Sequence, residues 1–297
     1  MEDDSVVIEQ FRAAVDRRLA DLLPDGAARP ARLAEAARYA VLSPGKRFRP
    51  MLTLLTARAF GAGPLAALDA ACAFEMVHAA SLILDDLPSM DDAALRRGRA
   101  TTHREFGEAT AILAAVGLLN QAFGVISGDE RLPDAARAGL LHRLSDSVGF
   151  EGLVSGQALD LNDRDHVRTA DDIDLLNHRK TGVLMVAAAE AGALIAGAPA
   201  ASVAAVGEFA RRLGLAFQIQ DDLIDAAFIA DTGKDLGKDL GKDAGMTTLV
   251  TVLGPQEAAA AVSAHLAAAQ AALARAGADG LLARYAFGLF EARKAAA

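Results

Sequence analysis

Helical periodicity runs through almost all of the 297 residues, and it constrains the fold more than any other feature. Alanine and leucine, both strong helix formers, supply most of the 53% hydrophobic content, and β-branched runs typical of strands are absent. No break in composition marks a linker, so we expect an all-α protein with one domain over 1–297. The pattern and its turn signals predict helices over 5–22, 28–42, 48–60, 64–87, 104–127, 133–147, 170–197, 200–228, 255–276 and 278–294.

Charge and cysteine content exclude several classes of function. A net charge of −9 argues against a nucleic-acid partner, because binding a polyanion needs a dominant basic surface. The single Cys72 cannot form an internal disulfide, which favours a reducing compartment and a buried packing role. The acidic N-terminus lacks the pattern of an export signal. The uncharged stretches 109–127 and 191–207 approach membrane-spanning length, but their composition favours buried bundle helices over stable membrane insertion.

An aspartate-rich segment, DDLPSMDD at 85–92, follows the long apolar helix expected over 65–84. Its four aspartates have no basic residue among them, so their mutual repulsion calls for a cation. A second cluster, DDLID at 221–225, also extends an apolar helix, and Asp221 and Asp225 share a helix face. Either cluster alone is typical of a solvated acidic patch. Two carboxylate groups on largely buried helices instead favour Mg²⁺, which binds carboxylates together with phosphate oxygens.

Basic motifs supply the opposite charge. They are GKRFRP at 45–50, RRGR at 96–99 and KTG at 180–182. Arginine matches diphosphate oxygens in bidentate fashion, and lysine supplies a point charge. His78 lies two helical turns before Asp85 and so shares its face. The acidic clusters could hold one diphosphate through Mg²⁺, and the basic residues could hold a second diphosphate directly. Two such substrates in one apolar bundle predict a reaction between their hydrophobic tails.

These motifs resemble the trans-polyprenyl diphosphate synthase family, most closely the bacterial carotenoid-type geranylgeranyl diphosphate synthases. The resemblance extends from about Arg32 to Gly254. It rests on GKRFRP, on HAASLILDDLPSMDDAALRRGRATTH, on HRKTG and on FQIQDDLID followed by TGKD, in this order. It implies an all-α isoprenoid synthase bundle with a central active-site cavity, a cytoplasmic homodimer and carotenoid biosynthesis as the setting. The implied reaction condenses isopentenyl diphosphate with dimethylallyl, geranyl or farnesyl diphosphate, with geranylgeranyl diphosphate as product.

The resemblance also implies roles for individual residues. The catalytic set is Asp85, Asp91, Lys180 and Asp221. Three Mg²⁺ ions are expected, with Asp85, Asp91, Asp221 and Asp225 as metal-binding residues. Lys46, Arg49, His78 and Arg97 are expected to bind isopentenyl diphosphate, and Arg96, Lys180, Thr181, Gln218 and Lys234 to contact the allylic substrate.

The chain departs from the family pattern in one segment. GKDLGKDLGKD at 233–243 is one four-residue unit longer than in many relatives, and Met246 stands where those relatives carry a lysine. Which of Lys234, Lys238 and Lys242 reaches a phosphate therefore stays open.

Three other functions share parts of this sequence pattern. A farnesyl diphosphate synthase differs only in product length. A class I terpene cyclase would carry an Asn/Ser/Glu second motif, and a non-catalytic regulatory subunit of a prenyl synthase would lack one aspartate motif. The small residues Ala79, Ala80 and Ser81 predict a pocket open at that depth, and we expect Ala80 to be the position where a Phe would shorten the product. The competing interpretation is that these small residues only let two helices pack closely.

Overall fold

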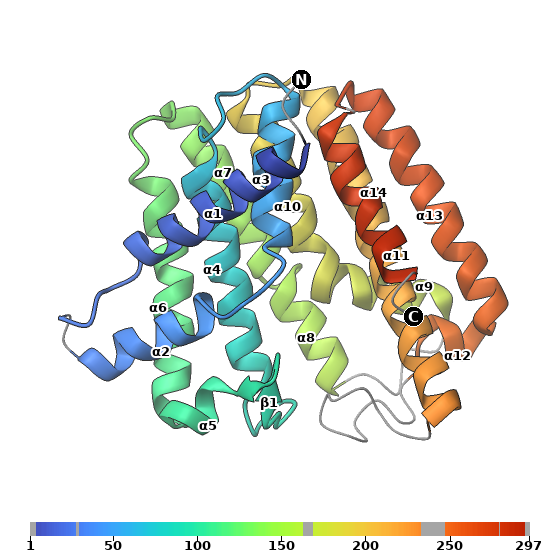
Figure 1. Cartoon of the computed structure of the whole chain (residues 1–297), viewed down its shortest axis with the longest axis horizontal. Coiled ribbons are helices and arrows are strands. Elements are labelled where there is room, and N and C mark those ends of the chain that lie inside the picture. The colour runs from blue at the N-terminus through green and yellow to red at the C-terminus, as the bar shows by residue number, and fades with distance from the viewer. Residues whose placement is uncertain (1–3, 28–29, 163–168, 233–246, 279, 295–297) are drawn as a thin grey trace.

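Helices form nearly all of the regular structure in the computed structural model, which describes residues 4–27, 30–162, 169–232, 247–278 and 280–294 (Figure 1). The helices are α1 (Asp4–Leu22), α2 (Ala31–Val41), α3 (Phe48–Ala59), α4 (Leu68–Asp85), α5 (Thr102–Phe106), α6 (Glu108–Ser127), α7 (Asp134–Val148), α8 (Leu153–Asn162), α9 (Ala170–Asn177), the π-helical turn η2 (His178–Gly182), α10 (Val183–Ile195), α11 (Ala200–Thr232), α12 (Leu249–Leu253), α13 (Pro255–Ala276) and α14 (Leu281–Lys294). The strands β1 (Leu95–Arg96) and β2 (Arg99–Ala100) form an antiparallel hairpin. The all-α prediction is confirmed.

The elements differ from the prediction in several places, three of which bear on the site described below. The helix predicted over 170–197 is divided by η2 into α9 and α10. Helix α8 was not predicted, because its ten residues carry weak amphipathic periodicity. The β1–β2 hairpin was also missed, because its strands are only two residues long and pair through the turn Arg97-Gly98. Both turn residues have positive φ (54° and 75°), as in a type I′ turn, where asparagine or glycine is usual at the first position.

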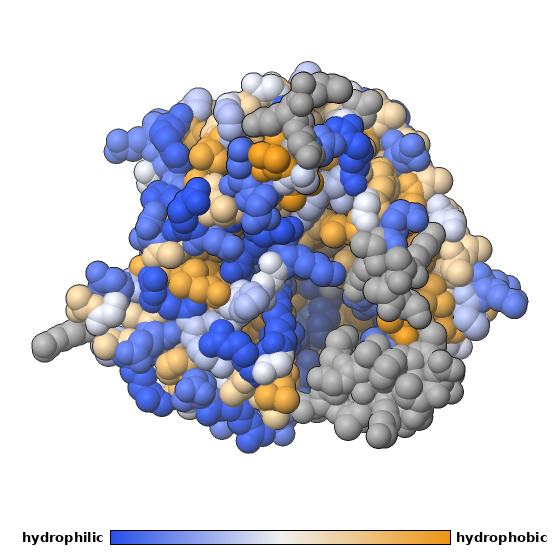
Figure 2. Space-filling model, in the orientation of Figure 1, coloured by the Kyte–Doolittle hydropathy of each residue, from blue (hydrophilic) through white to orange (hydrophobic). Residues whose placement is uncertain are grey.

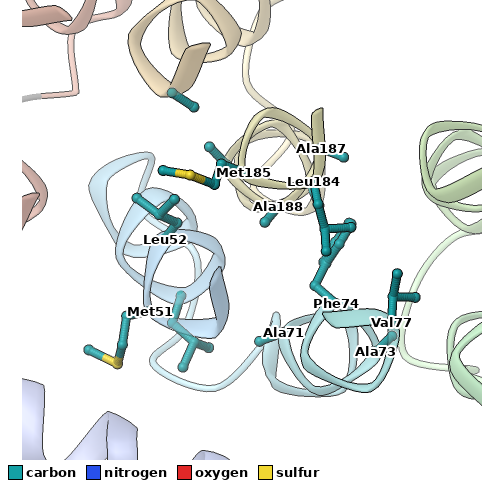
Figure 3. Packing of buried hydrophobic residues seen from close by; sticks show 14 of the residues in the cluster. Met51, Leu52, Ala71, Ala73, Phe74, Val77, Leu184, Met185, Ala187 and Ala188 are labelled. Atoms are coloured by element: carbon teal, nitrogen blue, oxygen red, sulfur yellow. The ribbon is translucent and has the colours of Figure 1, made fainter. Parts of the chain in front are cut away.

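The core lies between α3, α4 and α10 (Figure 3), and it continues into one cluster with residues from α1 to α14. Met51 and Leu52 of α3 and Phe74 of α4 belong to this cluster, and all three are 0% exposed. Gly192 lets α10 approach α3 closely, since a Cβ there would lie 2.3 Å from the Thr53 carbonyl oxygen. This packing matters for function because α3 and α10 begin, and α4 ends, at the cavity described below.

Cys72 is fully buried in this core, and burial raises the pKa of its thiol. The expected packing role is therefore supported by its position.

Helix α6 is the one helix among the described residues that is long and apolar enough to cross a membrane, with a mean hydropathy of 1.8 and 33% of that window buried. Ala111, Ala115 and Leu118 lie on its buried face, but the helix is buried over a smaller part than predicted. The stretch 191–207 is divided between the end of α10 and the start of α11.

Candidate active site

A cavity of about 1060 Å³ opens between α3, α4, α8, η2, α10 and α11. Figure 2 shows a hollow in this face of the molecule with hydrophilic residues along its border. Ten residues predicted from the sequence line the cavity: Lys46, Arg49, His78, Asp85, Arg96, Arg97, Lys180, Thr181, Gln218 and Asp221. Asp91 and Asp225 do not line it, and Lys234, Lys238, Lys242 and Met246 lie outside the described residues.

The first aspartate cluster begins at the last residue of α4. The Asp85 carboxylate faces the cavity and accepts a hydrogen bond of 2.6 Å from Gln157 Nε2 on α8. Its neighbour Asp86 is 3% exposed and accepts hydrogen bonds from Arg96 Nε and Nη2 at 2.8 and 2.6 Å. The two adjacent carboxylates therefore have different roles: Asp85 lines the cavity, while Asp86 holds the Arg96 guanidinium group beside it.

Arg96 reaches this position because the β1–β2 hairpin folds back under the end of α4 (Figure 1). Burial opposes its charge, but the hydrogen bonds and charge of Asp86, together with Asp85, raise the pKa of Arg96 overall. Its Nη2 atom also lies 3.6 Å from Asp85 Oδ2. The site thus holds a permanent cation next to the cavity-facing carboxylate.

Asp91 lies close to Asp85 because the chain between them forms tight turns. The Asp91 backbone N–H donates to the Asp85 carbonyl at 2.9 Å, and the Met90 N–H donates to the Leu87 carbonyl at the same distance. Asp85 and Asp91 are therefore neighbours at the end of α4, although the Asp91 side chain is not part of the cavity wall.

Lys180 is presented by the π-helical turn η2. Its Nζ atom pairs with Asp160 Oδ2 on α8 and lies 3.5 Å from Asp85 Oδ1. Burial lowers the pKa of Lys180, but the charges of Asp85 and Asp160 outweigh burial and raise it overall. In this arrangement Lys180 bridges the aspartate cluster to α8.

Gly156 of α8 sits directly against the η2 backbone. A Cβ at this position would lie 2.4 Å from the Lys180 nitrogen and 2.6 Å from the Arg179 carbonyl carbon. Only a residue without a side chain permits this approach.

Asp221 enters the cavity from α11, so the two aspartate motifs come from separate helices around the same space. Gln218, one turn earlier, donates to Asp222 Oδ1 at 3.2 Å. Phe217 of the same helix lines the cavity and stacks on Phe48 at a ring-centroid distance of 6.3 Å. These contacts tie the start of α3 to the second motif.

The cationic side of the cavity is formed by Lys46, Arg49, His78 and Arg97. Burial, with Arg97 nearby, lowers the pKa of Arg49 to about 10, and Glu75 opposes this shift. Burial and the neighbouring arginines lower the pKa of His78 well below 6.5. His78 is therefore neutral at pH 7 and offers a single ring N–H as a donor.

Sequence reasoning missed four polar residues of the cavity region: Arg47, Glu75, Gln157 and Asp160. Gln157 and Asp160 lie on the helix that periodicity did not reveal. Glu75 precedes His78 by three residues on α4, so its place on the His78 face could have been read from helical spacing.

The expected role of Ala80 is not supported. Ala80 is 0% exposed within the core and does not line the cavity. The α4 residues that face the cavity between its middle and its end are Val77, His78, Ser81, Leu82 and Leu84. Ala80 and Ser81 lie on different faces of α4, so Ser81 rather than Ala80 is the small residue that lines the cavity at this distance from Asp85.

The carboxylates present suit Mg²⁺ bound together with a diphosphate. Among the described residues, no three His, Cys, Asp or Glu side chains gather into a ready-made metal site. Mg²⁺ needs no such cage, since it binds one or two carboxylates and completes its shell with phosphate oxygens and water. Asp85 and Asp221, each on its own helix and facing the cavity, provide oxygen ligands of this kind.

Comparison with known proteins agrees with this geometry. The polyprenyl synthetase family model matches residues 30–275. A geranylgeranyl diphosphate synthase from Pantoea ananas is 46% identical over 260 residues, covering 87% of this chain and 84% of that protein. A farnesyl diphosphate synthase from Geobacillus stearothermophilus is 48% identical over 198 residues, covering 66% of this chain and 67% of that protein. The crystal structure of an FPP/GFPP synthase from Zymomonas mobilis superposes with a TM-score of 0.82 at 34% identity, covering 96% of each chain.

The helical bundle is the isoprenoid synthase fold. The chain belongs to the polyprenyl synthetase family, whose members depend on Mg²⁺ and use isopentenyl diphosphate and allylic diphosphates as substrates.

Proposed function

We propose that this protein is a Mg²⁺-dependent prenyltransferase that condenses isopentenyl diphosphate with allylic diphosphates and forms geranylgeranyl diphosphate as its main product. The observation that carries the proposal is the distribution of charge around one cavity. Lys46 and the neighbouring Arg49 and Arg97 line it, as do the paired Asp85 and Lys180, Asp221 of the second motif, and many apolar side chains. Two diphosphates with apolar tails fit this distribution.

In the proposed reaction, Lys180, Arg96, Thr181 and Gln218 hold the allylic diphosphate. Asp85, Asp91 and Asp221, with Asp225 in support, would hold three Mg²⁺ ions, and these would supply positive charge to the departing diphosphate. Lys180 stabilises the same charge directly, since a preorganised cation is worth most where charge develops.

Lys46, Arg49, His78 and Arg97 hold isopentenyl diphosphate so that its double bond faces the allylic cation. The allylic carbon–oxygen bond breaks first and leaves the cation, the isopentenyl double bond then forms the new carbon–carbon bond, and the released diphosphate takes the proton that the product loses. Leu82, Leu84 and Phe217 exclude water, which would otherwise quench the cation.

The proposed product length rests on the size of the cavity and on Ser81. About 1060 Å³ is at the upper end of the range for ligand pockets in proteins, and the small Ser81 leaves the wall of α4 open below Asp85. Further down, Val77, Leu119 and Val148 line the cavity and are candidates for its floor. A farnesyl diphosphate synthase is the second candidate, because the relative from Geobacillus stearothermophilus carries that name.

Incubating the purified chain with labelled isopentenyl diphosphate, each allylic primer and Mg²⁺ tests the proposal. We expect elongation to twenty carbons and none with a chelator. A fifteen-carbon main product would replace the product assignment, and absence of any elongation would support a regulatory subunit.

The functional unit is proposed to be a cytoplasmic homodimer of a single domain that spans 1–297, without stable membrane insertion. Support comes from α6, where Ile112, Leu113 and Val116 are 42%, 58% and 55% exposed although all are apolar. An apolar patch of this kind is typical of a protein interface. Sedimentation of a Leu113→Glu variant tests it: we expect a monomer, and an unchanged dimer would exclude this face.

A further inference from the structure

The cationic side of the cavity contains one buried carboxylate that the proposed function leaves without a role. Glu75 lies on α4, three residues before His78, and its side chain is 5% exposed. It lines the cavity together with Arg49 and Arg97. An acidic group is unexpected where an anionic substrate is to bind, because like charges repel.

Glu75 is paired with Arg47, another buried residue without an assigned role. Arg47 Nη1 donates to Glu75 Oε1 at 3.0 Å, and Arg47 Nε donates to Asp16 Oδ1 of α1 at 2.7 Å. Arg47 is itself 6% exposed. The pair therefore links α1, the start of α3 and α4 beneath the cationic wall.

The backbone of Arg47 is strained in a way that this pairing explains. Its φ is 49°, in the left-handed region that a residue with a Cβ adopts only at a conformational cost. Arg47 is the residue just before α3, so this conformation turns the chain at the point where the helix begins. Arg47 lines the cavity together with Lys46 and Arg49, but its guanidinium group is paired with Glu75 and Asp16.

Charge explains why a carboxylate stands here. Without a counter-charge, Arg47, Arg49 and Arg97 would repel one another in a largely buried space. The charge of Glu75 acts on all three guanidinium groups and favours their protonated forms. The Arg49 Nε atom is buried without a hydrogen-bond partner, so direct bonds do not fix that side chain completely.

Arg97 is held at the same place by a separate contact. Its Nη1 atom donates to the Pro44 carbonyl at 2.9 Å, and its guanidinium group packs on Gly45, where a Cβ would lie 2.4 Å from Nη1. The segment from Pro44 to Arg47 is thus held at two points, by Arg97 at Pro44 and by Glu75 at Arg47.

We propose that Glu75 is a positioning residue for the isopentenyl diphosphate side of the cavity: through Arg47 it fixes the turn that presents Lys46 and Arg49, and it keeps Arg49 and Arg97 together before substrate binds. This inference rests on the proposed function of that side of the cavity. Glu75 does not contact substrate in this proposal, and its loss acts through the arginines.

The test is Glu75→Gln, which keeps the shape of the side chain and removes its charge. Asp69→Asn is the matched control, because Asp69 is also a buried α4 carboxylate paired with arginines, Arg18 and Arg131 each at 2.7 Å, and it does not line the cavity. Steady-state kinetics with each substrate varied, calorimetric binding of isopentenyl diphosphate without an allylic substrate, and melting temperature are measured for both variants.

For Glu75→Gln we expect the KM for isopentenyl diphosphate to rise about tenfold or more, the effect of ~1.4 kcal/mol, with a parallel loss of calorimetric affinity. The KM for the allylic substrate should stay within about twofold of wild type. Asp69→Asn should lower the melting temperature and leave both Michaelis constants within about twofold.

Two results would overturn the inference. One is an unchanged KM for isopentenyl diphosphate in folded Glu75→Gln. The other is a lower KM, which is expected if Glu75 only repels the incoming diphosphate. If Glu75→Gln does not fold, the double variant Arg47→Met/Glu75→Met replaces it, since removing both members of a buried pair is better tolerated than removing one. The same rise in KM is expected there.

Arg49→Ala separates this inference from the proposed function. If Arg49→Ala raises the KM for isopentenyl diphosphate and Glu75→Gln does not, the function stands and the positioning role fails. If Arg49→Ala leaves that KM unchanged, the assignment of the cationic side to isopentenyl diphosphate fails.

Discussion

Replacing Gly156 with alanine tests whether the π-helical turn η2 sets the position of Lys180. The new Cβ would lie 2.4 Å from the Lys180 nitrogen and 2.7 Å from the Lys180 Cα, and both are backbone atoms that no side-chain rotation can move away. Contact between such atoms is favourable only at about 3.5 Å or more. Either α8 or η2 must therefore move by about 1 Å.

A shift of this size has two consequences. Overpacking of a buried helix contact costs about 1–3 kcal/mol of folding free energy. Lys180 would also leave its bridge between Asp160 and Asp85, and a misplacement of about 1 Å in an active site can lower activity by roughly 100-fold. We expect kcat/KM for the allylic substrate to fall by about this factor, with the KM for isopentenyl diphosphate changed much less.

The assay is steady-state condensation with the allylic substrate varied, beside thermal unfolding. Gly139→Ala is the control, because Gly139 also lies within a helix, α7, and a Cβ there meets nothing within 4 Å. That variant should keep its activity and gain slightly in stability, as alanine favours helices more than glycine does. Wild-type kinetics in a Gly156→Ala protein would refute the reasoning, since Lys180 could then tolerate the displacement.

Three further predictions follow from the site. Asp85→Ala and Asp221→Ala should each lower turnover by roughly 10²–10³-fold or more while the protein stays folded, and turnover at the Mg²⁺-supported rate in the presence of a chelator would contradict the metal-dependent scheme. Ser81→Phe should narrow the cavity and shift the main product from twenty carbons to fifteen, as measured by chromatography of the dephosphorylated products. An unchanged product would mean that Ser81 of α4 does not control product length. The pKa of His78 is well below 6.5 in the folded protein, so below pH 6.5 the unfolded chain binds more protons and the folded state loses stability as the pH decreases. Urea unfolding at pH 7, 6 and 5 should show that the free energy of unfolding depends less steeply on pH in His78→Gln, by up to ~1.4 kcal/mol per pH unit. Parallel pH profiles for the two proteins would mean that His78 is protonated when folded.

Much of the site could be predicted because its acidic and basic residues occur in short local motifs. Acidic and basic groups such as Asp85 and Arg49 stand at fixed spacings from helix ends, and a helix brings residues four apart onto one face whatever its surroundings. Ala80 shows the limit of this reasoning. Its distance from Asp85 along α4 was read correctly, but the rotation of the helix relative to the cavity depends on how α4 packs in the core.

The residues that were missed act through contacts between distant segments. Gln157 reaches Asp85 across 72 positions of sequence, and Glu75 meets Arg47 across 28. Helical period does not encode such pairs. The hairpin that carries Arg96 and Arg97 was missed for a different reason, since two-residue strands give no periodic signal.

The sequence by itself determined the all-α class, the two aspartate motifs at helix ends and the need for cations beside them, because helix formation and charge pairing depend on residue type and near neighbours. The tertiary structure decided which helix faces meet the cavity, the π turn against Gly156 that presents Lys180, and the burial of Glu75 with Arg47 under the cationic wall. These features arise from close approach between segments far apart in the chain, where packing selects one arrangement among many that the same local pattern allows.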